Sequence, residues 1–291
     1  MIRRNFRRSF TLVELLAVIM VFSILLSIVL AGVASAQRFA KEAHTKDLIA
    51  RLNTVIMAKW NSYLTRRVPV DLTKTTDRAS AAELRLDALH ELMRMEMPER
   101  FTDITSDRTS KLTYDPFLRG VYKAQYDTAN AKSPSTMTLN QPAKCLFMIV
   151  TAGTDDSDDR DFFSESDIVD IDGDGLRVFV DAWGKPIQFL RWAPAFESEL
   201  QPKPPVAAYQ FDPLGVLAKR RNTASFALYP LIYSGGPDET LDLNSGSITY
   251  STIKNDPFDD KVRTVVGEVG ITTKGEDHYS DNIHSHFIVI D

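Results

Sequence analysis

The sequence predicts an α+β fold, in which a long amino-terminal helix packs on a small antiparallel sheet with extra helices. Residues 10–64 contain no proline, and their apolar residues recur at helical spacing. The carboxyl-terminal half instead holds short β-branched and aromatic segments separated by turn signals. Of the 291 residues, 44% are hydrophobic and 25% charged, which is typical of a globular chain.

The amino-terminal segment is long and apolar enough to span a membrane. Residues 15–33 carry no charge, and about 20 apolar residues are needed to cross the hydrocarbon core as a helix. We therefore assign residues 10–33 to a single transmembrane helix. Four basic residues precede it: Arg3, Arg4, Arg7 and Arg8. By the positive-inside rule they predict a cytoplasmic amino terminus and a body beyond the membrane.

One carboxylate, Glu14, lies just inside this apolar boundary. A charge within a membrane costs about 2.5–3.5 kcal/mol on insertion scales, so Glu14 predicts a partner. The alternative is a cleaved secretory signal, for which Ala34-Ser35-Ala36 would be the small-residue site. The length of the apolar run and the presence of Glu14 both favour a membrane helix.

The helix is predicted to continue as an amphipathic segment over residues 34–64. It would be roughly 80 Å long from residue 10, at 1.5 Å per residue. Its apolar stripe should lie on the soluble part, residues 65–291, which forms an α+β head with acidic loops. The residues of this stripe are Leu48, Ile49, Leu52, Val55, Ile56, Trp60, Tyr63 and Leu64.

Further elements follow from local patterns in the head. A helix is predicted over 80–97, capped by Ser80 with Glu83 and ended by Pro98. Residues 101–142 suggest loops, with a strand or a helical turn among them. Residues 145–151 suit either a buried helix or a strand, with Cys145 as a small buried hydrophobe. Predicted strands are 176–180 and 187–192, which form a hairpin, and 226–234, 248–253, 261–269 and 286–290.

An acidic loop has the spacing of a calcium-binding loop. Asp170, Asp172 and Asp174 alternate, Gly175 takes position six, and Leu176 offers a backbone carbonyl at position seven. Asp181 stands at position twelve, where a longer Glu is usual. The alternative is a solvated turn in which aspartates cap their own backbone.

Other functions find little support. The basic cluster lies where a membrane would take it, which argues against nucleic-acid binding. No hydrolase, zinc-peptidase or phosphate-binding motif is present, so we expect no enzyme. On a strand, His284 and His286 would share one face, as a transition-metal site needs, but exposed strand histidines are more common.

The segment Ser9-Phe10-Thr11-Leu12-Val13-Glu14-Leu15-Leu16 resembles the cleavage and methylation site of type IV prepilins and type II secretion pseudopilins. The resemblance implies that a prepilin peptidase cuts between Ser9 and Phe10, so that residues 1–9 form a basic leader and Phe10 is methylated. It also implies that Glu14 meets the amino terminus of a neighbouring subunit. The family usually has Gly where this chain has Ser9.

Two later segments are similar to major pseudopilins. Tyr233-Ser234-Gly235-Gly236-Pro237-Asp238 and the return through Asp281 are similar to the ends of their calcium loop, which implies calcium ligands at Asp238 and Asp281. The run 181–187 resembles a D-x-W-G-x-P turn of the same family. That second resemblance implies a structural role for Asp181, which competes with its role as a calcium ligand.

Together these features predict a pilin-like subunit of a type II secretion pseudopilus or type IV pilus-like filament. Its expected partners are the prepilin peptidase, copies of itself, other pilin-like subunits and an inner-membrane assembly platform. It would be a single-pass protein of the bacterial inner membrane with a periplasmic head, and a periplasmic or surface filament when assembled. The alternative is a membrane-anchored periplasmic calcium-binding or enzymatic domain that never polymerises.

Overall fold

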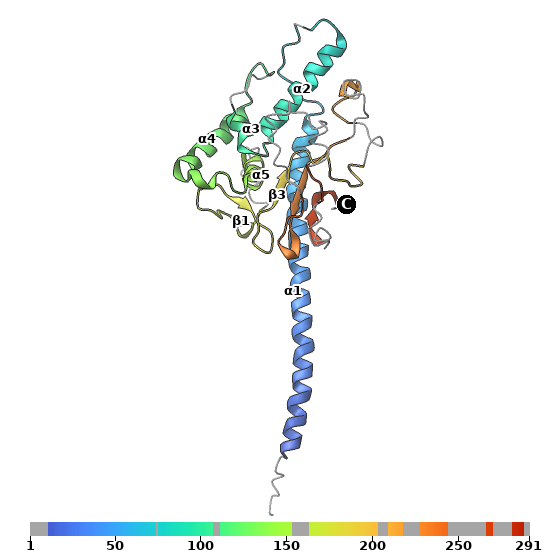
Figure 1. Cartoon of the computed structure of the whole chain (residues 1–291), viewed down its shortest axis with the longest axis vertical. Coiled ribbons are helices and arrows are strands. Elements are labelled where there is room, and N and C mark those ends of the chain that lie inside the picture. The colour runs from blue at the N-terminus through green and yellow to red at the C-terminus, as the bar shows by residue number, and fades with distance from the viewer. Residues whose placement is uncertain are drawn as a thin grey trace, which may run out of the picture. The chain divides into compact units, whose positions relative to one another are not determined.

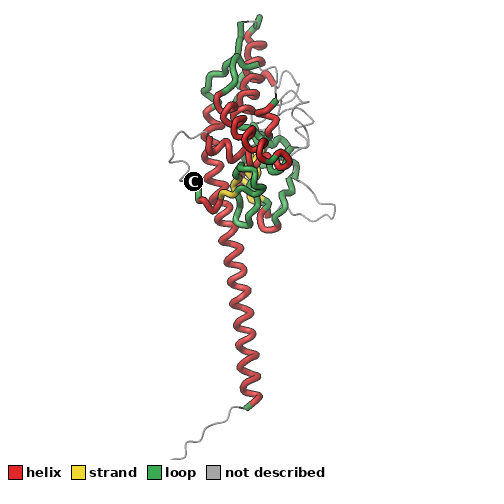
Figure 2. The backbone as a smooth tube through the Cα atoms, turned by 90° about the vertical axis from the view of Figure 1, so that its left-hand side faces the viewer, coloured by secondary structure: helices red, strands yellow, loops and turns green. Residues whose placement is uncertain are grey.

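The structure is a computed structural model that describes residues 11–73, 75–106, 111–152, 163–202, 209–217, 227–243, 266–269 and 281–287. The chain divides into two compact units, Met1–Ala43 and His44–Asp291. We call the second unit the head. The head combines several helices with short strands and loops (Figure 2), and the predicted α+β class is confirmed.

The long amino-terminal helix is confirmed as α1, Leu12–Ser62 (Figure 1). From Thr45 onward its buried side chains recur every three or four residues, which is the amphipathic stripe that the spacing predicts. Leu64 departs from the prediction because it lies beyond the helix end and is 45% exposed. Tyr63 is fully buried, and its hydroxyl donates to Glu96 of α2 at 2.9 Å.

Helix α2, Arg78–Glu96, is confirmed, but its predicted cap is wrong. Asp77 is the N-cap, and its carboxylate accepts from the Ser80 backbone N–H at 2.9 Å and from the Ser80 hydroxyl at 2.7 Å. A carboxylate that accepts two hydrogen bonds satisfies the helix start better than one hydroxyl would, so the N-cap lies three residues before the predicted one.

The segment 101–142, predicted as loops, is largely helical. It forms α3 (Phe101–Thr105), α4 (Phe117–Lys132) and the 3₁₀ turn η1 (Pro134–Thr136). Helix α4 buries Tyr122 and Ala129, and Leu118 and Tyr126 pack beside them, so these four residues form a stripe at helical spacing that the prediction missed.

Helix α5, Gln141–Ala152, resolves the choice left open for 145–151. Most of its side chains are buried, which is why the segment has no polar face. Cys145 lies in it with no exposed surface, and burial raises the pKa of its thiol well above the usual value.

The strands form two small antiparallel sheets. The 3₁₀ turn η3 (Glu165–Asp167) leads into β1 (Ile168–Val169), which pairs with β2 (Val178–Phe179). In the other sheet β3 (Gln188–Leu190) pairs with β4 (Leu231–Ser234), which pairs with β5 (Ile283–His284). Two further 3₁₀ turns, η4 (Gly236–Asp238) and η6 (Ser285–Phe287), follow β4 and β5.

The predicted hairpin is therefore only partly right. Its arms are joined by a single bridge between Val180 and Pro186 and by the Ile187 N–H donating to the Phe179 carbonyl. Beyond this point β2 and β3 belong to different sheets. The predicted strand 286–290 begins instead in η6, and the predicted strand 248–253 and most of 261–269 lie outside the described residues.

A buried ionic cluster lies beneath this sheet. The Arg191 guanidinium donates to Asp103 at 3.1 Å and to the Met97 carbonyl at 2.8 Å. The Arg191 backbone N–H donates to Glu99 at 3.1 Å. Arg191 and Glu99 have no exposed surface, so each charge depends on the others for compensation.

Candidate functional site

The first candidate site is the start of α1. The predicted cleavage residues Ser9 and Phe10 lie outside the described residues. Thr11 and Glu14 form a capping box: the Glu14 carboxylate accepts from the Thr11 N–H and hydroxyl, both at 2.9 Å. The Glu14 N–H completes it by donating to the Thr11 hydroxyl at 3.3 Å.

This capping box changes the expectation about the partner of Glu14. We expected its partner to come from another molecule, yet Thr11 supplies one within the chain. The T-x-x-E pattern is the sequence signal that identifies it. The role of Glu14 in assembly stays a prediction, and Thr11 is the additional residue of interest.

The apolar half of α1 exposes large hydrophobic side chains. Large side chains from Leu12 to Val33 are about half exposed or more; Phe22, for example, is 66% exposed. Among the described residues, α1 is the one helix whose length and composition suit a membrane span. Such a large apolar surface requires either lipid or other protein to cover it.

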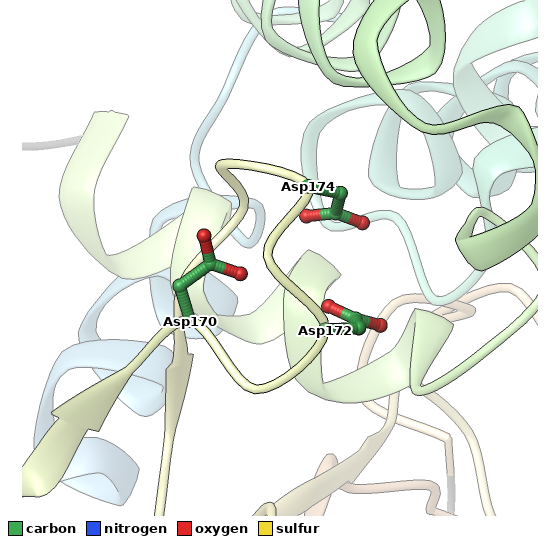
Figure 3. Close-up of side chains that lie close together, drawn as sticks. All are labelled: Asp170, Asp172 and Asp174. Atoms are coloured by element: carbon green, nitrogen blue, oxygen red, sulfur yellow. The ribbon is translucent and has the colours of Figure 1, made fainter.

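The second candidate site is the loop of residues 170–176, which follows β1. The carboxylates of Asp170, Asp172 and Asp174 lie close enough together to share one metal ion (Figure 3). Asp170 accepts from the backbone N–H groups of Gly173 at 2.8 Å and Gly175 at 3.0 Å, as in the solvated-turn alternative.

A lysine from α5 reaches into this loop. The Lys144 ammonium donates to Asp172 at 2.8 Å and to Asp174 at 2.6 Å. Burial alone would raise the pKa of Asp174, but the hydrogen bonds from Lys144 and from the Leu176 N–H outweigh it and lower the pKa. Lys144 precedes the loop by 28 residues in one contact and 30 in the other, so no local pattern could have identified it.

Asp181 is engaged elsewhere. One carboxylate oxygen accepts from the N–H groups of Trp183 and Lys185, each at 2.9 Å. The other accepts from the Ser234 hydroxyl at 2.6 Å. Trp183 packs against the core, so this geometry favours the structural role for Asp181 over a ligand role. Leu176 has a buried side chain and donates its N–H to Asp174 at 2.8 Å.

The third candidate site joins η4 to the segment before β5. The Asp238 N–H donates to Asp281 at 3.2 Å, which brings together the two residues that the resemblance pairs. Burial raises the pKa of Asp281, and the nearby negative charge of Asp238 raises it further. Within the described part of the chain, a buried oxygen of Asp281 and one of its neighbour Asn282 have no hydrogen-bond partner.

Among the described residues the histidines form no shared-face metal site, and the preferred prediction of exposed strand histidines is also wrong, because His284 and His286 are buried. His284 ends β5, whereas His286 lies in η6, so the two do not share a strand face. Both ring nitrogens of His286 are engaged, with the Ser198 hydroxyl at 2.8 Å and the Pro230 carbonyl at 3.0 Å.

Comparison with known proteins gives one match, at the amino terminus. Residues 4–30 match the family model described as the prokaryotic N-terminal methylation motif. Searches of curated proteins and of solved structures found no match to the chain. The chain thus carries a prepilin-type N-terminal methylation motif together with a long apolar helix, which is consistent with a type IV pilin-like protein.

Proposed function

We propose that this protein is a structural, non-enzymatic subunit of a type II secretion pseudopilus or of a type IV pilus-like filament. The observation that carries the proposal is the methylation motif at residues 4–30, joined to a helix whose apolar side chains are uncovered. In the precursor, lipid would cover these side chains. In the filament, the same helix from neighbouring subunits would cover them.

The motif and the flanking charges give the order of events. The arginines before α1 keep the amino terminus cytoplasmic, and the head lies in the periplasm. A prepilin peptidase cuts between Ser9 and Phe10, and Phe10 is methylated. An inner-membrane platform then assembles the subunit with copies of itself and with other pilin-like subunits.

Mass spectrometry of the mature amino terminus tests this proposal. After co-expression with a prepilin peptidase we expect N-methylated Phe10. A Ser9→Gly variant, which restores the usual family residue, should be processed at the same bond. An amino terminus following Ala36, or an uncut Met1, would contradict the proposal.

The assembly role of Glu14 needs a separate experiment. We expect Glu14→Gln to be cut and to remain in the membrane, but to enter filaments poorly because the paired charge is gone. Thr11→Val is the matched control, since it removes the capping hydroxyl and keeps the carboxylate. A Glu14→Gln protein that assembles normally would refute the pairing role, and wild-type protein that never assembles would favour an anchored, non-polymerising domain.

We further propose that calcium binds at the turn that contains Asp238 and Asp281. Two unpartnered buried oxygens and the raised pKa of Asp281 support it, because a divalent cation would relieve both. Asp238, Asp281 and Asn282 would hold the ion. Its effect would be to fasten the residues before β5 to η4 and so stabilise the head.

Thermal unfolding of the full chain in detergent, with calcium or with a chelator, tests the calcium proposal. A site present only in the folded state stabilises it by about 2.7 kcal/mol at a hundredfold excess of ligand over Kd. Asp281→Asn should remove the calcium response, and Asp170→Asn should retain it. Equal melting of the wild type with calcium and with chelator would reject the site.

A further inference from the structure

We propose that Lys144 is the resident cation of the 170–176 loop and that this loop folds without a divalent metal. Aspartate spacing makes the loop look like a calcium site, and its three carboxylates do lie within reach of one ion. The contacts of those carboxylates assign that position to a side chain of the protein itself.

The Lys144 ammonium is fully used within this site. An ammonium has three N–H donors, and Lys144 has three acceptors: Asp172 at 2.8 Å, Asp174 at 2.6 Å and the Thr136 carbonyl at 3.2 Å. Its side chain is only 1% exposed. A lysine is almost never buried to this degree unless its charge is paired.

The carboxylate oxygens are largely used as well. Both oxygens of Asp170 accept from backbone N–H groups, and one oxygen of Asp174 accepts from the Leu176 N–H. The second oxygen of Asp174 accepts from Lys144 and also from the Thr136 hydroxyl at 3.1 Å. Calcium requires about six to eight oxygen ligands, and these oxygens already accept protein hydrogens.

Electrostatics leads to the same conclusion. An ion that shared the Asp172 and Asp174 oxygens with Lys144 would sit a few ångströms from a buried positive charge, and like charges at that distance repel strongly. Asp181, the twelfth residue of the calcium-loop spacing, is held by Ser234 and its own turn. The site therefore fits one ammonium and does not fit calcium.

The turn at Asp281 differs from the 170–176 loop in the surroundings of its carboxylate. An oxygen of Asp281 is buried without a hydrogen bond, and the charge of Asp238 raises the pKa of its carboxyl group. The loop at residue 170 has its counter-charge built in, whereas at residue 281 the neighbouring Asp238 adds a second negative charge. A calcium response of the head should accordingly be confined to the second turn.

Glycine-selective ¹⁵N NMR of the full chain in detergent micelles provides the test. The amides of Gly173 and Gly175 report on the loop, and the amide of Gly236 reports on the other turn. In the wild type we expect millimolar calcium, added after a chelator, to leave the Gly173 and Gly175 resonances in place. Movement of either resonance beyond its linewidth would overturn the proposal, whatever Gly236 does.

A lysine substitution gives the second arm. Lys144→Met should displace the Gly173 and Gly175 resonances without calcium and lower Tm by on the order of 10 °C, because two buried carboxylates lose their counter-charge. Lys123→Met is the control, since Lys123 forms only an exposed pair with Asp127. Unchanged resonances and Tm in Lys144→Met would overturn the proposal. If that variant does not fold, the wild-type titration decides alone.

Discussion

Glu99 should make the stability of the head depend on pH, and Glu99→Gln isolates that dependence. The pKa of Glu99 is raised from 4.5 to about 7, because burial outweighs the lowering by the Arg191 and Arg100 charges and Asp103 adds to the rise. Glutamine has nearly the same shape, keeps an acceptor for the Arg191 N–H and never ionises, so it mimics the protonated acid.

The direction in which stability changes with pH follows from whether the folded or the unfolded chain holds the proton of Glu99. Between pH 4.5 and about 7 the folded protein keeps a proton on Glu99 that the unfolded chain has released, so its contribution to stability falls as pH rises. Each pH unit of difference corresponds to about 1.4 kcal/mol, so the full loss is on the order of 3 kcal/mol. We expect Glu99→Gln to gain about 2 to 3 kcal/mol relative to the wild type between pH 5 and pH 7.5.

Urea unfolding of the full chain in a non-denaturing detergent, followed by tryptophan fluorescence, measures this difference at each pH. Burial also lowers the pKa values of His284 and His286 to about 4, but their effect is common to both proteins and cancels. Glu165→Gln is the control, since the Glu165 side chain is 87% exposed.

A flat difference between the two proteins would refute the raised pKa of Glu99. A difference of opposite sign, in which the variant loses ground as pH rises, would mean that Glu99 is charged in the fold and is stabilised by Arg191. The two outcomes separate burial from ion pairing as the dominant influence on this carboxyl group.

Substitutions also test three local features of the head: a helix cap, a close backbone approach and the apolar stripe of α1. Asp77→Ala should destabilise the head by about 1 kcal/mol, and Ser80→Ala by less, because Asp77 is the cap of α2; equal losses in urea unfolding would contradict this. Gly236→Ala and Gly215→Ala share a positive φ, of 65° and 63°, but only Gly236 meets backbone where a Cβ would stand. We expect Gly215→Ala to cost about 1–2 kcal/mol and Gly236→Ala clearly more; similar Tm values would refute the close approach. Leu52→Ala, in the stripe of α1, should cost about 2–5 kcal/mol by urea unfolding, and a loss below 1 kcal/mol would show that this stripe contributes little.

The sequence predicts those elements whose causes are local. Helix α1 was predictable because nothing interrupts it and its stripe repeats from Thr45 to Trp60. Helix α4 was missed although Leu118, Tyr122 and Tyr126 recur at helical spacing, because the prolines that flank the segment favour loops. The start of α2 was misjudged because the Ser80 pattern masks the stronger carboxylate acceptor three residues earlier.

The candidate sites also divide into one that a single segment defines and others that depend on contacts between distant segments. The methylation motif, which includes Glu14, is one continuous segment, so the sequence alone identifies it. Lys144 meets Asp172 and Asp174 only after α5 and the loop have folded together, and the spacing of the aspartates alone suggests the wrong cation. The hairpin arms part because β2 pairs with β1, which precedes it closely, whereas β3 pairs with the more distant β4.

Cys145 has a practical consequence for work on this protein. It is the single cysteine of the chain, it has no exposed surface, and the raised pKa of its thiol keeps it protonated at neutral pH. Maleimide reagents should therefore ignore the native chain while it is folded. A cysteine introduced at an exposed position of α1, such as Ser27, would then carry a label alone and report by disulfide cross-linking which helices become neighbours.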